Sequence, residues 1–215
     1  MDIALQAVFD AYPPIRSPKP FSYGTSGFRG PGETLIAIAC RMGPLMALRC
    51  VAAGVGTCTG VCFTASHNPH ADNGLKLIDT TGDMLPEDWE PHAEALANSD
   101  TPVAYFRGLM TTLGVTEDQL RKATVNIGRD TRPTGVPMSV ACTASIKAVG
   151  GRVNDFGVVT TPQLHFTVEK GFRGEPVGDY VEEAVAAFKT LFGPAASTSL
   201  QVIVDCSRRD DILCA

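Results

Sequence analysis

The sequence predicts an α/β domain in which helices pack on a sheet that contains parallel strands. The apolar run over 60–63 breaks off into a turn, which is typical of a strand that delivers a loop to the edge of a sheet. Further on, a strand over 125–128, a helix over 138–149 and a strand over 153–159 follow one another. Alternation of this kind implies that the two strands pair in parallel.

The N-terminal part predicts a short helix over 3–9, then a lead-in marked by prolines, then a long helix over 34–53. The stretch 35–56 is apolar enough to suggest a membrane span, but Arg41 and Arg49 would be costly near the centre of one. We therefore expect a buried helix of a domain and no membrane association.

The middle of the chain predicts a second strand over 75–78, which is entered through the turn residues 72–74. A helix over 86–98 follows, with acidic residues in its first turn, where the helix dipole favours them. A less regular connector over 99–116 and a short helix over 116–122 lead to the next strand.

The C-terminal part predicts a helix that starts at Thr161 and carries His165 on its packing face. The glycine-rich stretch 171–178 indicates a linker between domains. An amphipathic helix over 179–192 and a strand over 200–205 are expected beyond it.

Length and composition set outer limits on the organisation. A chain of 215 residues suggests one domain plus part of another. We divide it into a lead-in over 1–22, a main domain over 23–170, the linker over 171–178 and the start of a second domain over 179–215. The apolar fraction of 44% is enough for a packed core.

Charge and cysteine content narrow the function classes. The net charge of -5 argues against a nucleic-acid surface and means that a phosphate site must be locally positive. Seven cysteines, an odd number with no C-x-x-C pair, indicate reduced core thiols in a cytosolic protein. Nothing at the N-terminus resembles a secretory leader, and no obligate protein partner is expected.

Two loops carry the candidate chemistry. Ser66 lies in the hexapeptide TASHNP, which lacks the G-x-S-x-G pattern of a hydrolase nucleophile. His67 is its direct neighbour, so the two side chains need not face each other as a nucleophile and its base must. The segment 23–30 contains three glycines and can bring backbone amides close to a phosphate, although such a loop alone indicates only a turn. The guanidinium of Arg29 suits phosphate oxygens, which it meets two at a time.

Four segments resemble motifs of the α-D-phosphohexomutases in one ordered series. YGTSGFR over 23–29 is similar to their phosphate-facing loop, and TASHNP over 64–69 to their phosphoserine loop. DNGLK over 72–76 is similar to the segment with their active-site lysine, and GRDTRP over 128–133 to a fourth motif. The series implies their domain I, a mixed sheet sandwiched by helices, followed here by the truncated start of a second similar domain.

The order of the motifs resembles one subfamily. In most phosphohexomutases the GRD-type motif precedes the serine loop, whereas Arg129 lies downstream of Ser66 here. This order is similar to that of the phosphoacetylglucosamine mutases, as are NGLKLID over 73–79 and TTPQLH over 160–165. The resemblance implies interconversion of N-acetylglucosamine 6-phosphate and 1-phosphate through a phosphoserine and a bisphosphate.

The resemblance also implies a role for each site residue. Ser66 carries the phosphoryl group and, through it, touches Mg²⁺, while His67 or Lys76 transfers protons and Arg29 supplies a fixed cation. The residues implied in phosphate or substrate binding are Thr25, Ser26, Gly27, Arg29, Arg129, Asp130 and Arg132. Taken without the resemblance, Arg129 and Asp130 indicate a structural ion pair.

The end of the chain departs from the family pattern. The D-G-D-x-D metal loop is absent, and Asp210-Asp211 lacks its glycine and its spacing. We therefore expect an incomplete Mg²⁺ site and a truncated, inactive fragment. Two alternatives stay open, namely a mutase for unacetylated hexose phosphates and a non-catalytic module that binds a phosphate or a partner mutase.

Overall fold

The computed structural model describes residues 1–15, 19–54, 57–175 and 178–193 of the chain. These residues divide into two units, Met1–Glu175 and Pro176–Ala215. The first unit contains the sheet and all the candidate site residues. The second contributes one described helix, and the predicted strand over 200–205 and the pair Asp210-Asp211 lie outside the described residues.

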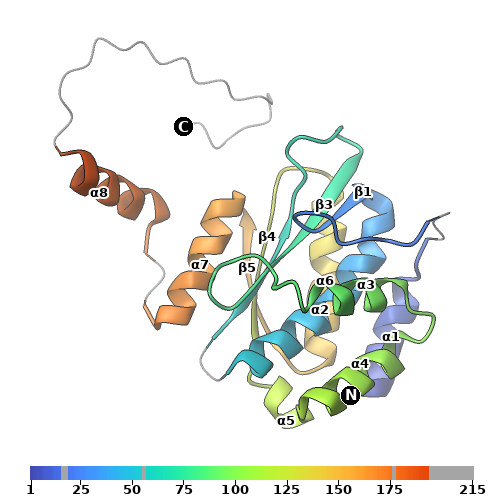
Figure 1. Cartoon of the computed structure of the whole chain (residues 1–215). Coiled ribbons are helices and arrows are strands. Elements are labelled where there is room, and N and C mark those ends of the chain that lie inside the picture. The colour runs from blue at the N-terminus through green and yellow to red at the C-terminus, as the bar shows by residue number, and fades with distance from the viewer. Residues whose placement is uncertain (16–18, 55–56, 176–177, 194–215) are drawn as a thin grey trace. The chain divides into compact units, whose positions relative to one another are not determined.

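A five-stranded mixed sheet in the order β1-β3-β2-β4-β5 forms the centre of the first unit (Figure 1). Its strands are β1 (Phe28–Pro31), β2 (Thr59–Phe63), β3 (Asp72–Ile78), β4 (Thr124–Arg129) and β5 (Arg152–Val158). β3 is antiparallel to both β1 and β2, whereas β2, β4 and β5 run parallel. The predicted parallel pairing of the two later strands is therefore confirmed.

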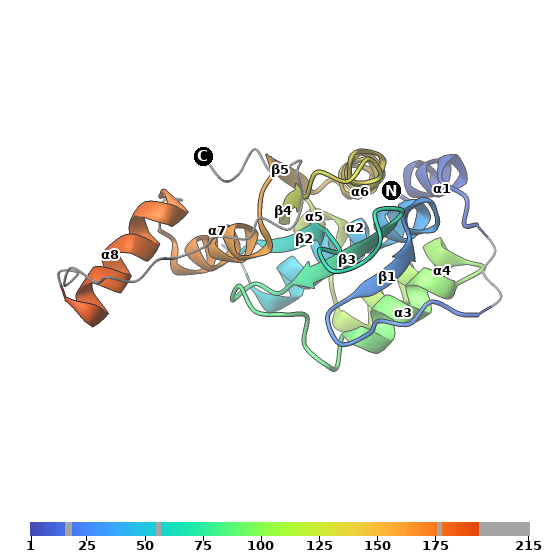
Figure 2. The same cartoon turned by 90° about the horizontal axis from the view of Figure 1, so that it is seen from above.

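Helices cover both faces of this sheet. In chain order they are α1 (Asp2–Ala11), α2 (Gly32–Ala53), α3 (Glu90–Asn98), α4 (Pro102–Leu113), α5 (Glu117–Leu120), α6 (Gly135–Ala148) and α7 (Thr161–Arg173). Figure 1 shows α2 and α6 on one side of the sheet and α7 on the other, and Figure 2 shows the same layers from above. The predicted α/β class, a mixed sheet sandwiched by helices, is confirmed.

The alternation of side chains along the strands builds a core on each face. The larger core packs the sheet on α2 and α6 and takes from the strands Val61, Phe63, Leu75, Leu77, Val125 and Ile127. The smaller core packs the opposite face on α7 and consists of Cys58, Cys62, Ile78, Leu164 and Val168. The position of a residue along its strand thus determines which of the two cores its side chain packs in.

The central helix α2 passes the length and hydropathy test for a membrane span, but 78% of its tested window is buried inside the unit. The expectation of a buried domain helix is met. α2 lies very close to α6, because a Cβ placed on Gly43 would stand 2.4 Å from the Oγ of Ser145. Only a glycine allows the two helices to approach this far.

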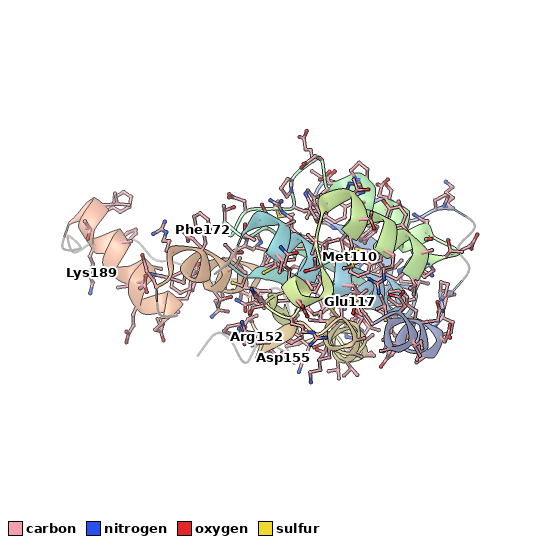
Figure 3. The ribbon with its side chains drawn as sticks, turned by 90° about the horizontal axis from the view of Figure 1, so that it is seen from below. Met110, Glu117, Arg152, Asp155, Phe172 and Lys189 are labelled. Carbon is pink, nitrogen blue, oxygen red and sulfur yellow. The ribbon has the colours of Figure 1, made fainter. Side chains whose placement is uncertain are left out.

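The prediction of an irregular connector over 99–116 is wrong, because α4 occupies most of it. Pro102 stands in the first turn of this helix, where its missing N–H costs nothing, and Gly114 ends it in the left-handed conformation. Between them Phe106, Leu109 and Met110 are buried at helical spacing. Figure 3 labels Met110 on α4 and Glu117 on α5, the two helices between which Gly114 lies in the sequence.

Other boundaries shift by a few residues. α3 begins at Glu90 rather than at 86, because residues 86–89 form a turn closed by the Trp89 N–H on the carbonyl of Pro86 (2.9 Å). α7 continues to Arg173, inside the range predicted as linker, and Gly174 caps it. In the second unit the described helix α8 (Tyr180–Phe192) is capped by the Asp179 carboxylate.

Candidate active site

The loop that carries Ser66 joins two adjacent antiparallel strands, β2 and β3. We name residues 64–72 the serine loop. The Thr64 N–H donates to the carbonyl of Gly74 at 3.0 Å, so the loop leaves the sheet directly beside β3. Within it Asn68 N–H donates to Ala65 (2.9 Å) and Asp72 N–H to the carbonyl of Pro69 (3.0 Å). Two successive turns therefore shape the loop, and Ser66 is exposed on it.

Arg132 holds the serine loop by its backbone. The Nη1 atom donates to the carbonyls of Pro69 (2.8 Å) and Asp72 (2.7 Å), and Nη2 donates to those of Ala65 and Asn68. Nε donates to the Asp130 carboxylate at 3.2 Å. These contacts use all the N–H groups that a guanidinium possesses.

This arrangement differs from the predicted roles of the fourth motif. With every donor of Arg132 bound to protein oxygens and its side chain only 2% exposed, this residue has no N–H left for a phosphate. The predicted ion pair between Arg129 and Asp130 is wrong, since Asp130 pairs with Arg132. The Asp130 carboxylate also accepts the Arg132 backbone N–H at 2.9 Å.

A short chain of hydroxyl groups connects this carboxylate to the candidate nucleophile. The Oγ1 of Thr64 donates to Oδ2 of Asp130 at 2.8 Å and lies 3.4 Å from the Oγ of Ser66. Thr64 is buried, whereas Ser66 is exposed. Thr64 is not among the predicted site residues, although it is the first residue of the motif TASHNP and stands where strand and loop meet.

Strand pairing sets Arg29 and Lys76 on the same face of the sheet. Residues opposite one another in paired strands share a face, and so do residues two apart along one strand. β3 pairs Gly74 with Arg29 of β1 and Lys76 with Cys62 of β2. Because Cys62 belongs to the smaller core, both cationic residues stand on the face away from the larger core.

The glycine-rich segment 23–27 rests directly on this part of β3. A Cβ on Gly27 would stand 2.1 Å from the carbonyl oxygen of Leu75 and 3.1 Å from the Cα of Lys76, so only a glycine fits. Beyond it the chain continues into β1, whose first residues lie in the range predicted as a loop. Nη2 of Arg29 donates to Oγ of Ser26 at 2.7 Å, which ties the cation to this segment.

For three predicted site residues that the structure describes, His67, Thr25 and Arg129, it shows no contact with Ser66. His67 and Thr25 are exposed, and the contacts of the described residues do not join them to Ser66. Arg129 pairs with Phe63 in the parallel register and lies 3.4 Å from a Cβ placed on Gly135, at the start of α6. It therefore stands on the sheet face opposite to Arg29 and Lys76.

The described residues do not fit a complete magnesium site. Nowhere in ranges 1–15, 19–54, 57–175 and 178–193 do three His, Cys, Asp or Glu side chains come together so as to hold a metal ion. The carboxylate linked to Ser66 is that of Asp130, and its oxygens already accept from Arg132 and Thr64.

Comparison with known proteins places these observations in a family. The family model for phosphoglucomutase/phosphomannomutase, alpha/beta/alpha domain I, matches residues 25–104 and 104–176. The phosphoacetylglucosamine mutase of Oryza sativa subsp. japonica is 41% identical over 178 residues, which are 80% of this chain and 31% of the relative. The phosphoacetylglucosamine mutase of Homo sapiens is 40% identical over 150 residues, which are 68% of this chain and 27% of the relative.

Solved structures give the same result. An N-acetylphosphoglucosamine mutase of Aspergillus fumigatus, a serine-to-alanine variant in complex with glucose 1,6-bisphosphate, superposes with a TM-score of 0.78 at 32% identity. The match covers 87% of this chain and 36% of that one. The same mutase in complex with GlcNAc-6P and magnesium gives a TM-score of 0.69 at 34% identity over 80% of this chain and 32% of its own.

This chain spans about a third of the length of the relatives that it matches. The match with the family model includes residues 25–27 of the glycine-rich segment, the serine loop, β3 and the fourth motif, all within the first unit. The chain therefore belongs to the α-D-phosphohexomutase superfamily, as a homologue of the phosphoacetylglucosamine mutases that contains their domain I.

Proposed function

We propose that Ser66 is the phosphoryl carrier of a phosphoacetylglucosamine mutase, which interconverts N-acetylglucosamine 6-phosphate and 1-phosphate. The observation that carries the proposal is the serine loop itself. Its one exposed hydroxyl group, that of Ser66, stands on a loop whose backbone is fixed by Arg132 at four carbonyls. The loop leads into β3, which carries Lys76 and pairs with Arg29 of β1. The names of the similar proteins supply the substrate class.

The proposed chemistry needs placement and positive charge more than it needs a strong base. Phosphoryl transfer gains mostly from holding the reacting oxygens in line and from cations on the oxygens that move. In the first half-reaction the bond between phosphorus and the Ser66 oxygen breaks, and a sugar hydroxyl oxygen takes the phosphoryl group. The proton that this hydroxyl loses is the one that the freed serine oxygen gains, so atoms and charge balance.

The second half-reaction reverses these steps at the other phosphate of the bisphosphate. Ser66 then acts as the nucleophile, and the sugar oxygen is the leaving group. We assign the charge stabilisation to Arg29 and Lys76 and the proton transfer to Lys76 or His67. The backbone at Gly27 lies against Leu75 and Lys76 of β3, and the Gly27 N–H donates to the carbonyl of Gly24 at 3.3 Å. We therefore assign the N–H groups of Thr25 and Ser26 to phosphate oxygens.

A magnesium ion is present in one relative. For this chain we propose only that a phosphate on Ser66 would offer the metal an oxygen ligand. No step above depends on the ion, because the described residues do not supply a set of ligands for it.

The test is the phosphorylation of Ser66 in the purified chain. The chain is incubated with glucose 1,6-bisphosphate, the compound that the Aspergillus relative binds, and its intact mass and peptide masses are measured. We expect one phosphate, located on Ser66 and absent from Ser66→Ala. The matched control is Ser22→Ala, which removes another exposed serine hydroxyl and should leave the phosphate in place.

A chain that takes up no phosphate, or takes it up equally in Ser66→Ala, would overturn the proposal. Mutase turnover is measured in the same samples with N-acetylglucosamine phosphate and with glucose phosphate. Turnover by the chain alone would contradict the expectation of an inactive fragment, and a preference for glucose phosphate would favour the unacetylated alternative.

A further inference from the structure

The hydroxyl group of Thr64 lies between the Ser66 hydroxyl group and the Asp130 carboxylate. Thr64 is 4% exposed and is the first residue of the serine loop, directly after β2. Its hydroxyl oxygen lies 2.8 Å from a carboxylate oxygen of Asp130 on one side and 3.4 Å from the Ser66 hydroxyl oxygen on the other. A buried hydroxyl group with two such neighbours has little freedom in how its hydrogen points.

The direction of each hydrogen bond follows from the number of hydrogens. A threonine hydroxyl has one hydrogen, and an ionised carboxylate can only accept. The Thr64 hydrogen is therefore used on Asp130, whose oxygens also face the N–H and Nε–H of Arg132. At the contact with Ser66, Thr64 can then only accept, so the Ser66 hydroxyl must be the donor.

We propose that Thr64 and Asp130 are positioning residues that orient the unphosphorylated Ser66 hydroxyl for its role as phosphoryl acceptor. The proposal rests on the function proposed above for Ser66. When the serine hydrogen points to Thr64, the lone pairs of the serine oxygen point away from Thr64 and are available to the phosphorus atom that it attacks. An exposed hydroxyl without this contact would turn freely and bond to water.

The contact depends on the state of the serine. Phosphorylated Ser66 has no hydroxyl hydrogen, so it cannot donate to Thr64. The orienting contact therefore exists only in the unphosphorylated chain and acts in the half-reaction in which Ser66 receives the group. This dependence separates the proposal from a purely structural role of Thr64, which would be the same in both states.

The test compares Thr64→Val with Thr64→Ser. Valine has nearly the shape of threonine but no hydroxyl, whereas serine keeps the hydroxyl and loses a methyl group. The first measurement is the side-chain rotamer of unphosphorylated Ser66, read from its NMR couplings. We expect one rotamer in the native chain and in Thr64→Ser, and rotamer averaging in Thr64→Val.

The second measurement is the rate at which glucose 1,6-bisphosphate phosphorylates Ser66. We expect Thr64→Val to be about tenfold slower, the effect of one hydrogen bond, and Thr64→Ser to recover most of the lost rate. If Thr64→Val fails to fold, Asp130→Asn takes its place, because an amide can donate its N–H₂ to Thr64. The Thr64 hydrogen is then free to point to Ser66, so the serine hydroxyl no longer has to be the donor.

The outcomes separate the two proposals. A Ser66 rotamer that is unchanged in Thr64→Val, or a loss in Thr64→Ser equal to that in Thr64→Val, would overturn the role of Thr64. A native chain that takes up no phosphate would instead count against the proposed function, and the rotamer measurement would still decide the orienting contact.

Discussion

Replacing Arg132 by methionine is the sharpest perturbation of the serine loop. The side chain of Arg132 is 2% exposed, and it donates to four backbone carbonyls and to Asp130. Methionine fills a similar volume and donates nothing. The substitution therefore removes the hydrogen bonds without leaving a large cavity.

The expected decrease in the free energy of unfolding of Arg132→Met can be calculated from these contacts. Hydrogen bonds to a charged group contribute roughly 1.5–3 kcal/mol each, and five of them would sum to more than any single residue is known to contribute. Of the four freed carbonyls, one belongs to the exposed Pro69 and two to the half-buried Asn68 and Asp72, and the Asp130 side chain is 25% exposed. Water therefore replaces part of the lost hydrogen bonding. We therefore expect the cost of breaking a buried ion pair, about 3–5 kcal/mol.

The assay is urea unfolding followed by the fluorescence of Trp89, the single tryptophan of the chain. The matched control is Arg121→Met, which removes an arginine whose side chain is 69% exposed and whose ion pair with Asp118 is 3.8 Å long. Such a surface pair contributes about 0–1 kcal/mol. If Arg132→Met costs no more than this control, the guanidinium does not hold the loop and the reasoning is refuted.

Two further predictions follow from the same region. Gly27→Ala should lower the free energy of unfolding by more than about 2 kcal/mol, because the φ of 110° and the Leu75 carbonyl both exclude a Cβ; Gly30→Ala, with nothing within 4 Å of its Cβ position, is the control, and equal losses would contradict the argument. The free energy of unfolding should also fall above pH 9, because burial raises the pKa of the Cys62 thiol from 9.0 to about 11. The thiol of the unfolded chain therefore ionises at a lower pH than that of the folded chain. The folded state loses stability relative to the unfolded state as the pH rises from 9 toward 11. The urea midpoint is measured from pH 8 to pH 10 in the native chain and in Cys62→Ala. If it stays constant in both chains, the prediction for Cys62 is refuted.

The order of elements could be predicted from the sequence because most of them carry strong local signals. The buried strands β2 and β4 are short apolar runs, and α2 and α6 are long apolar segments that end at glycines or turns. α4 was missed because its buried residues are few and its sequence contains a glycine and two threonines, which lower helix propensity. β1 was missed because half of its residues are glycine and proline, so only its pairing with β3 defines it.

The roles inside the site were harder to predict. Sequence similarity marks the fourth motif as functional but cannot show that the N–H groups of Arg132 donate to backbone carbonyls. Those carbonyls lie in the serine loop, sixty or more residues away. Likewise Thr64 acquires its role only through Asp130, which a distant strand delivers. Contacts of this kind depend on tertiary structure, and no periodic pattern of residues in the sequence indicates them.

The connection between Ser66 and Lys76 has a consequence for how this chain can vary. Surface connections between strands ordinarily tolerate inserted or deleted residues. The Arg132 guanidinium binds this connection at both ends, and the connection leads into β3. Successive side chains of β3 alternate between the face of the larger core, which holds Leu75 and Leu77, and the face that holds Lys76. Loss of one residue would carry the Lys76 ammonium toward hydrocarbon and bring Leu75 or Leu77 out in its place, so homologues that keep this architecture should keep the spacing between serine and lysine unchanged.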